Sequence, residues 1–116
     1  MRQAAARGLL ATVANALLGV ALQATPAGAA AAERARTHEV VIQGLLYGPE
    51  TLTVRPGDVV VWINKDPFPH TVTAAGAFDS KDIAAGASWK YVARRAGSHS
   101  YICTLHPNMK GTLTIE

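Results

Sequence analysis

The heptapeptide Cys103-Thr104-Leu105-His106-Pro107-Asn108-Met109 sets a thiol, an imidazole and a thioether three residues apart in one short loop. Pro107 stiffens this loop, so three donor atoms can curl around a single ion. A second imidazole, His70, lies far upstream in Asp66-Pro67-Phe68-Pro69-His70. Because the fourth donor comes from another part of the chain, the polypeptide must fold back on itself to complete the site.

This donor set is typical of one class of metal site. One thiolate, two imidazoles and one thioether make up a blue-copper electron-transfer site, with His, His and Cys in a trigonal plane and Met weakly on the axis. We therefore predict that His70, Cys103, His106 and Met109 bind one copper ion. A site held between two rigid segments moves little when the metal changes charge, and this favours one-electron transfer.

The N-terminus has the pattern of a secretory signal peptide. Arg2 and Arg7 precede the largely apolar run 9–22, and Ala27-Gly28-Ala29 supplies the small residues of a cleavage site. We expect residues 1–29 to be a signal peptide, cleaved near Ala29, and residues 30–116 to be one exported domain located in the periplasm. An uncleaved membrane anchor is the alternative, although the apolar run is short for a span.

Composition narrows the function further. The formal charge of +3 for 116 residues falls to about +1 once Arg2 and Arg7 leave with the signal, and the remaining basic residues are scattered, which argues against nucleic-acid binding. A single cysteine cannot form an internal disulfide, so Cys103 must pair between chains, remain a thiol or bind metal. Met109 is the only methionine after the predicted cleavage point.

The rest of the chain reads as short strands separated by turns, and no segment after the signal shows a sustained helical period. The most apolar run, 59–64, is expected to be a central strand covered on both faces. The strands are predicted at 38–46, 51–54, 59–64, 71–73, 88–93, 99–103 and 111–115. About seven such strands favour an all-β fold, a small antiparallel Greek-key β-sandwich.

The chain resembles the cupredoxins of the amicyanin and plastocyanin kind. The resemblance rests on Trp62-Ile63-Asn64, Pro69-His70, the segment from Gly97 to Tyr101, and Cys103-Thr104-x-His106-Pro107-x-Met109. The short gaps in the last motif are more similar to amicyanin than to plastocyanin, whose loop is longer. The resemblance covers the whole predicted domain and implies a cupredoxin-like β-sandwich with one type 1 copper ion.

The resemblance also implies a role for each donor. Cys103 would supply the short thiolate bond and the visible absorption, and His70 would be the buried equatorial ligand. His106 would be the ligand whose exposed ring edge passes electrons, and Met109 the weak axial donor that tunes the reduction potential. The protein would then be a one-electron carrier, not an enzyme, that docks transiently as a monomer with dehydrogenase-like or cytochrome-like redox proteins.

Two departures from the family pattern concern the loops. Thr71 stands where these proteins usually have Asn; its backbone N–H is expected to point at the Cys103 sulfur, but the side-chain tie between the two ligand loops is expected to be lost. Leu105 stands where amicyanin-like loops often have Pro. Pro67, Phe68, Leu105 and Pro107 are expected to form an apolar collar around His106 that suits brief docking, with ordinary loop packing as the alternative for Phe68 and Leu105.

Other interpretations remain open. A copper storage or delivery protein could use the same donors, and a zinc site is a variant of it, although thioether is a poor zinc ligand. A cysteine enzyme with Cys103 as nucleophile and His106 as base would leave His70 and Met109 unexplained. His38 and His99 are expected to be structural or solvent-facing.

Overall fold

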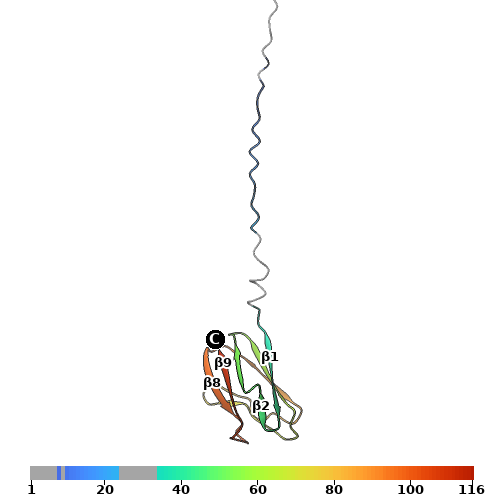
Figure 1. The fold of residues 1–116 in the computed structure, drawn as a ribbon, viewed down its shortest axis with the longest axis vertical. Helices are drawn as coiled ribbons and strands as arrows, with labels where there is room; N and C mark the ends of the chain where they lie inside the picture. Colours follow the sequence, from blue (N-terminus) through green and yellow to red (C-terminus); the bar gives the residue numbers. More distant parts are fainter. Residues whose placement is uncertain (1–7, 9, 24–33) are drawn as a thin grey trace, which may run out of the picture.

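The computed structural model describes residues 8, 10–23 and 34–116 (Figure 1). The predicted signal cleavage near Ala29 lies outside the described residues. Residues 10–22 of the apolar run form neither helix nor strand. Within the described ranges, no helix is long and apolar enough to span a membrane.

Nine strands form two facing sheets, and the described residues contain no helix (Figure 1). The strands are β1 (Thr37–Gln43), β2 (Leu46–Gly48), β3 (Thr51–Val54), β4 (Val59–Asn64), β5 (Thr73–Ala74), β6 (Phe78–Asp79), β7 (Ser88–Val92), β8 (Gly97–Ile102) and β9 (Lys110–Ile115). One sheet has the order β2-β1-β4-β7 and the other β3-β9-β8-β5-β6. The predicted all-β sandwich is confirmed.

The core lies between the two sheets and follows the two-residue period of the strands. In β4, the side chains of Val60, Trp62 and Asn64 are buried while the alternate positions are half-buried. This strand is central in its sheet, as predicted, but the expectation that it is covered on both faces is wrong. Only the face toward the other sheet is fully enclosed, because in a two-layer sandwich the outer face of each sheet can border solvent.

The prediction of a purely antiparallel sandwich is also wrong. Strand β1 pairs in parallel with β4, and β3 pairs in parallel with β9. Greek-key sandwiches place strands from different hairpins side by side, so a strand can meet a neighbour that runs in the same direction. The remaining pairs of named strands are antiparallel.

The predicted strand 38–46 is in fact two strands joined by a tight hairpin. Gln43 pairs with Leu46, and the two residues between them, Gly44 and Leu45, have φ values of 62° and 61°. Two positive φ values are the mark of a type I′ turn, which reverses the chain within two residues. A leucine with a positive φ is unusual, so contacts with another part of the chain are needed to stabilise this backbone conformation.

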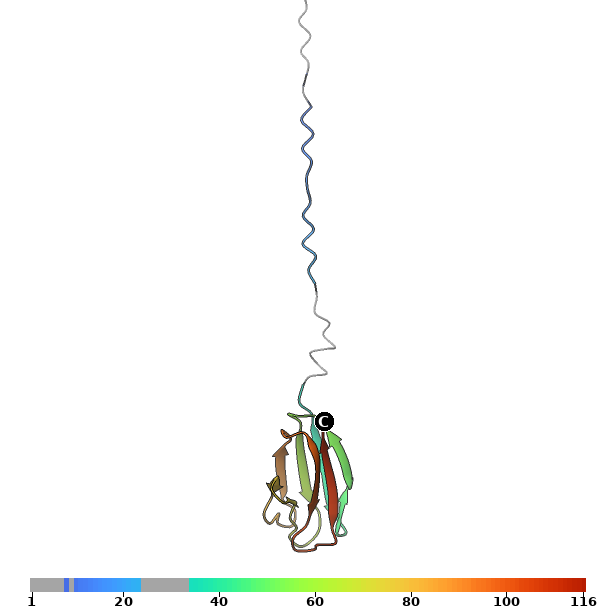
Figure 2. The ribbon, with the colours of Figure 1, turned by 90° about the vertical axis from the view of Figure 1, so that its left-hand side faces the viewer.

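The ligand-bearing loops meet at one end of the sandwich. Strand β9 ends beside the C-terminus, at one end of the sandwich (Figure 2). The β8–β9 connection, which precedes this strand, therefore lies at the other end of the sandwich. The β4–β5 connection contains His70, and the β8–β9 connection contains Cys103, His106 and Met109. The first connection crosses from one sheet to the other and the second lies within the five-stranded sheet, and both contribute to a shared site.

Candidate copper site

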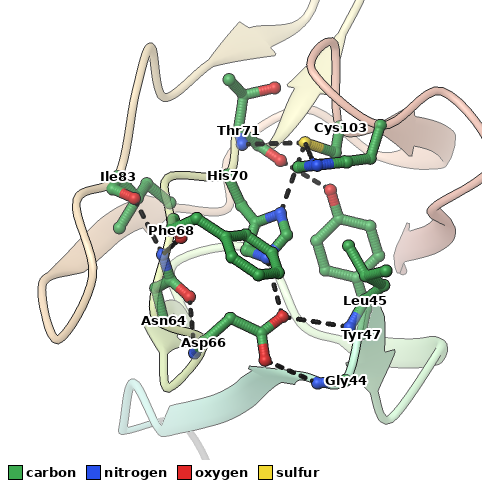
Figure 3. A network of polar contacts seen from close by, with 11 residues as sticks. Gly44, Leu45, Tyr47, Asn64, Asp66, Phe68, His70, Thr71, Ile83 and Cys103 are labelled. Atoms are coloured by element: carbon green, nitrogen blue, oxygen red, sulfur yellow. Dashed lines mark hydrogen bonds and ion pairs between the residues drawn. The ribbon is translucent and has the colours of Figure 1, made fainter.

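Three of the predicted donors converge at this end of the sandwich. The Cys103 Sγ lies 3.7 Å from the His70 Nδ1 and 3.7 Å from the His106 Nδ1, and all three donor atoms lie within 4.8 Å of one another (Figure 3 shows the first pair). The side chains of Cys103 and His70 are completely buried, whereas His106 is half-buried. One imidazole is therefore sealed inside the protein and the other reaches its surface.

Met109, the fourth predicted donor, is buried beside this cluster and is tied to it through the backbone. The N–H of His106 donates to the Cys103 carbonyl at 3.2 Å, and the N–H of Met109 donates to the His106 carbonyl at 2.8 Å. The N–H of Cys103 donates in turn to the Met109 carbonyl at 3.2 Å. The three residues thus close a ring of backbone hydrogen bonds. The three-residue spacing allows this ring, because the N–H groups of His106 and Met109 each reach the carbonyl of the residue three positions earlier and the ring closes from Cys103 to Met109.

Asp66, which was not among the predicted site residues, orients His70. The His70 Nε2 lies 2.8 Å from the Asp66 Oδ2, and both side chains are buried (Figure 3). An ionised carboxylate only accepts, so the Nε2 must carry the proton and the Nδ1 lone pair faces Cys103. The sequence feature that could have indicated this role is the position of Asp66, a carboxylate four residues before the predicted ligand His70.

The same carboxylate supports the unusual hairpin turn. The N–H groups of Gly44 and Leu45 donate to the two Asp66 oxygens at 2.7 and 3.0 Å (Figure 3). Burial raises the pKa of Asp66, but the hydrogen bonds from Leu45, Gly44 and His70 outweigh it and hold the pKa below its usual value. Asp66 therefore joins the β1–β2 turn to the buried histidine as an anion.

Thr71 behaves partly as predicted and partly not. Its backbone N–H donates to the Cys103 Sγ at 3.3 Å, which confirms the expected contact with the sulfur (Figure 3). The expected loss of the tie between the loops is wrong. The Thr71 Oγ1 accepts the Thr104 N–H at 2.8 Å and lies 3.2 Å from the Thr104 Oγ1, so a shorter hydroxyl side chain still connects the two ligand loops.

Two further buried side chains fix the loop that leads to His70. The Asn64 side-chain amide donates to the carbonyls of Phe68 and Ile83, both at 2.9 Å, and its oxygen accepts the Asp66 N–H at 3.0 Å. The Tyr47 hydroxyl donates to the Thr71 carbonyl at 2.6 Å, and burial raises the pKa of this phenol well above its ordinary value. The buried side-chain polar atoms of the described residues are all hydrogen-bonded, as expected of a rigid site.

The exposed edge of the site is apolar, but its composition differs from the predicted collar. A groove of about 600 Å³ runs beside His106, and its lining includes Leu45, Leu46, Leu105 and Pro107 but not Pro67. The Phe68 ring packs against His106, with the two ring centroids 5.6 Å apart, but does not line the groove. The prediction of one continuous strand over 38–46 did not place Leu45 and Leu46 here, because their position depends on the β1–β2 hairpin.

The other histidines lie apart from this cluster, as expected. The His38 Nε2 bonds the buried Asp58 at 2.9 Å, and the His99 Nε2 bonds the Arg95 carbonyl at 3.1 Å. The aromatic residues Trp62, Phe78 and Tyr101 are buried in the core, and the half-buried Trp89 and Tyr91 pack against it. Within the described ranges, His70, Cys103 and His106 form the one cluster of three potential metal ligands of the His, Cys, Asp and Glu types.

The donor chemistry fits copper. A buried thiolate, two imidazoles with their Nδ1 atoms turned toward it and an adjacent thioether are soft and borderline donors that suit copper, whereas structural zinc sites avoid thioether. His70, Cys103, His106 and Met109 are positioned as a copper site.

Comparison with known proteins agrees with this geometry. Residues 12–115 match the family model of the cupredoxin-like domain. Amicyanin from Paracoccus versutus is 30% identical over 66% of this chain and 63% of its own length, and plastocyanin from Scenedesmus fuscus is 27% identical over 62% of this chain and 88% of its own. A Cu(I) structure of an amicyanin variant superposes with a TM-score of 0.66 at 29% identity, covering 74% of this chain and 89% of that one. The chain belongs to the cupredoxin-like family.

Proposed function

We propose that the protein is a type 1 copper protein that carries single electrons between redox partner proteins. The observation that supports this most is the pairing of a sealed thiolate and imidazole with a second imidazole, His106, that emerges into an apolar groove. His70, Cys103, His106 and Met109 would hold the copper ion.

Bound copper supplies the redox chemistry by alternating between Cu(II) and Cu(I). The chain contributes a donor geometry that does not relax when the charge changes, because Asp66 holds the His70 ring and the Thr71 N–H holds the Cys103 sulfur. A hydrogen bond to the thiolate also withdraws electron density from it. The buried surroundings exclude water, so little solvent needs to reorganise during transfer.

Electrons enter and leave through His106 in this proposal. Its ring is half-buried, contacts Phe68 and borders the groove that includes Leu105, which is 48% exposed. An apolar rim lets a partner approach closely and displace water, and a small contact area keeps the complex short-lived. The partners would be dehydrogenase-like or cytochrome-like redox proteins, and the carrier would be a monomer rather than an enzyme.

Export fits the same proposal. Residues 1–29 would be a cleaved signal peptide and residues 30–116 the cupredoxin domain, which would act in the periplasm. The described strands begin at Thr37, after the proposed cleavage point. Mass spectrometry of the protein recovered from the periplasm tests this: a mature N-terminus near Ala30 supports it, and an intact leader contradicts it.

The competing function is copper storage or delivery by the same donors. A carrier keeps its copper in both oxidation states and exchanges electrons rapidly, whereas a delivery protein releases the ion to an acceptor. The rate of electron self-exchange, measured by NMR line broadening in mixtures of oxidised and reduced protein, separates the two. Rapid exchange without copper loss supports the carrier, and slow exchange with release to a chelator contradicts it.

The docking surface can be tested in the same assay. Leu105→Glu places a charge beside His106 and should slow self-exchange by at least tenfold, because two molecules must bring these edges together. Val92→Glu is the matched control, since Val92 is a similarly exposed apolar residue on β7, outside the ligand loops. Equal effects of the two substitutions would argue against electron passage at the His106 edge.

A further inference from the structure

A row of three threonine hydroxyls connects the copper-binding loop to the protein surface. The Thr104 Oγ1 lies 3.2 Å from the Thr71 Oγ1, which lies 3.0 Å from the Thr73 Oγ1. The Thr73 hydroxyl in turn donates to the Asp79 Oδ1 at 3.1 Å, across the β5–β6 pair in which these two residues are partners. Thr71 and Thr73 are two residues apart, so an extended backbone directs both side chains to the same side.

The outer end of this row is an anion. The Lys81 backbone N–H donates to Asp79 at 2.9 Å and the Lys81 ammonium lies 3.0 Å from it, and these contacts lower the pKa of Asp79. The carboxylate is therefore ionised at neutral pH and can only accept hydrogen bonds.

This constraint fixes the direction of every hydrogen bond in the row. Each threonine hydroxyl has one proton, and Thr73 must donate its proton to the hydrogen bond with Asp79. Thr73 can then only accept from Thr71, so the Thr71 proton points outward, away from the copper loop. With its proton used, the Thr71 oxygen can only accept from Thr104, both from its N–H at 2.8 Å and from its hydroxyl at 3.2 Å.

We propose that Asp79, acting through Thr73, orients the Thr71 hydroxyl and so sets the local field at the Cys103 loop, which makes Asp79 and Thr73 positioning residues for the copper site. The Thr71 oxygen turns both lone pairs toward Thr104, the residue that follows Cys103. The negative end of its dipole faces the site, and this favours the more positively charged Cu(II) state. The consequence for copper rests on the proposed function, whereas the orientation of the hydroxyls does not.

The orientation can be observed without copper. Neutron diffraction from crystals of the deuterated, copper-free protein locates the hydroxyl deuterons. The expected result is a Thr73 deuteron directed at Asp79, a Thr71 deuteron directed at Thr73 and a Thr104 deuteron directed at Thr71. A Thr71 deuteron directed at Thr104 would overturn the proposal, whether or not the protein carries electrons.

The effect on copper is tested by the reduction potential of the loaded protein. Thr73→Val removes the outward acceptor without changing charge, so the Thr71 proton turns toward Thr104 and the potential should rise. Thr73→Ser keeps the hydroxyl and should leave the potential unchanged. A potential that does not rise in Thr73→Val, or that rises equally in Thr73→Ser, would contradict the proposal.

A double-mutant cycle separates the hydroxyl row from simple loss of charge. Asp79→Ala should raise the potential more in the native background than in Thr73→Val, because only the native row can transmit the orientation. Asp82→Ala is the matched control: Asp82 is exposed and, within residues 34–116, makes no hydrogen bond to this row. Its effect should be the same in both backgrounds. Additive shifts for Asp79→Ala would overturn the proposal, and absence of a blue copper site in the native protein would instead refute the proposed function.

Discussion

Replacing Asp66 by Asn probes the connection between the hairpin and the buried ligand most sharply. The carboxylate accepts three hydrogen bonds, from Gly44, Leu45 and His70, at 2.7, 3.0 and 2.8 Å. An amide of the same shape has one accepting oxygen, and its NH₂ group would face a donor in either orientation. If the NH₂ group faces His70, the imidazole can only satisfy it by moving its proton to the Nδ1, the atom needed for copper.

The expected magnitudes follow from these bonds. A hydrogen bond to a charged group contributes about 1.5–3 kcal/mol to stability. Asp66→Asn loses at least one such bond, and it also leaves the new NH₂ group facing another N–H donor. We expect the free energy of unfolding of the copper-free Asp66→Asn protein to fall by about 2–4 kcal/mol. Loss of a carboxylate that orients a histidine ligand typically weakens metal affinity by about 10–100-fold, and we expect copper affinity to fall within that range.

Two assays measure these effects separately. Urea unfolding of the copper-free protein gives the stability change, and competition with a chelator of known affinity gives the change in copper binding. Asp82→Asn, which removes an exposed carboxylate, should change stability by no more than about 0.5 kcal/mol. If Asp66→Asn matches this control in both assays, the assigned role of Asp66 is refuted.

Three further substitutions test other parts of the account. Met109→Leu should raise the reduction potential of the copper-loaded protein, because axial donation to Cu(II) is lost; an unchanged or lower potential in voltammetry would count against Met109 as the axial ligand. Gly111→Ala should lower the free energy of unfolding by about 1–3 kcal/mol, since the new methyl would lie about 2.7 Å from the Tyr101 Cε2 and against the ring's hydroxyl end; native stability in urea would show that the ring can move aside. Asp58 has its pKa lowered to about 2 by the backbone N–H groups of Arg36 and Arg55 and by His38, so its stabilisation is complete above about pH 4 and is lost as the pH falls through 2. The stability difference between native protein and Asp58→Asn should therefore shrink by about 2 kcal/mol between pH 5 and pH 2, and a constant difference would contradict this assignment.

The donor residues were predictable because their chemistry is local and distinctive. A single cysteine, spaced three residues from a histidine and six from the only mature methionine, leaves few alternatives, and the backbone ring through Cys103, His106 and Met109 explains the spacing. The all-β sandwich was also within reach, since alternation and turn residues are local properties, but the count was not: seven strands were predicted and the structure has nine.

The remaining features depend on contacts between distant segments. The parallel pairing of β1 with β4 leaves no mark in either strand, because alternation is the same for both pairing directions. The Gly44-Leu45 turn was hidden because leucine rarely adopts a positive φ, and what permits it is Asp66, more than twenty residues away. The tie through Thr71 depends on how closely the two ligand loops approach in the folded protein, where the Thr104 N–H lies 2.8 Å from the Thr71 hydroxyl.

The most direct test of the central claim is the visible spectrum of the protein after addition of Cu(II), recorded beside that of Cys103→Ser. A trigonal site with Cys103, His70 and His106 predicts an intense blue thiolate-to-copper band in the native protein and its loss in the variant, which should keep the β-sandwich because serine is close to cysteine in size. A weak, ordinary Cu(II) spectrum in the native protein, or a strong band that survives in Cys103→Ser, would contradict the proposed copper site.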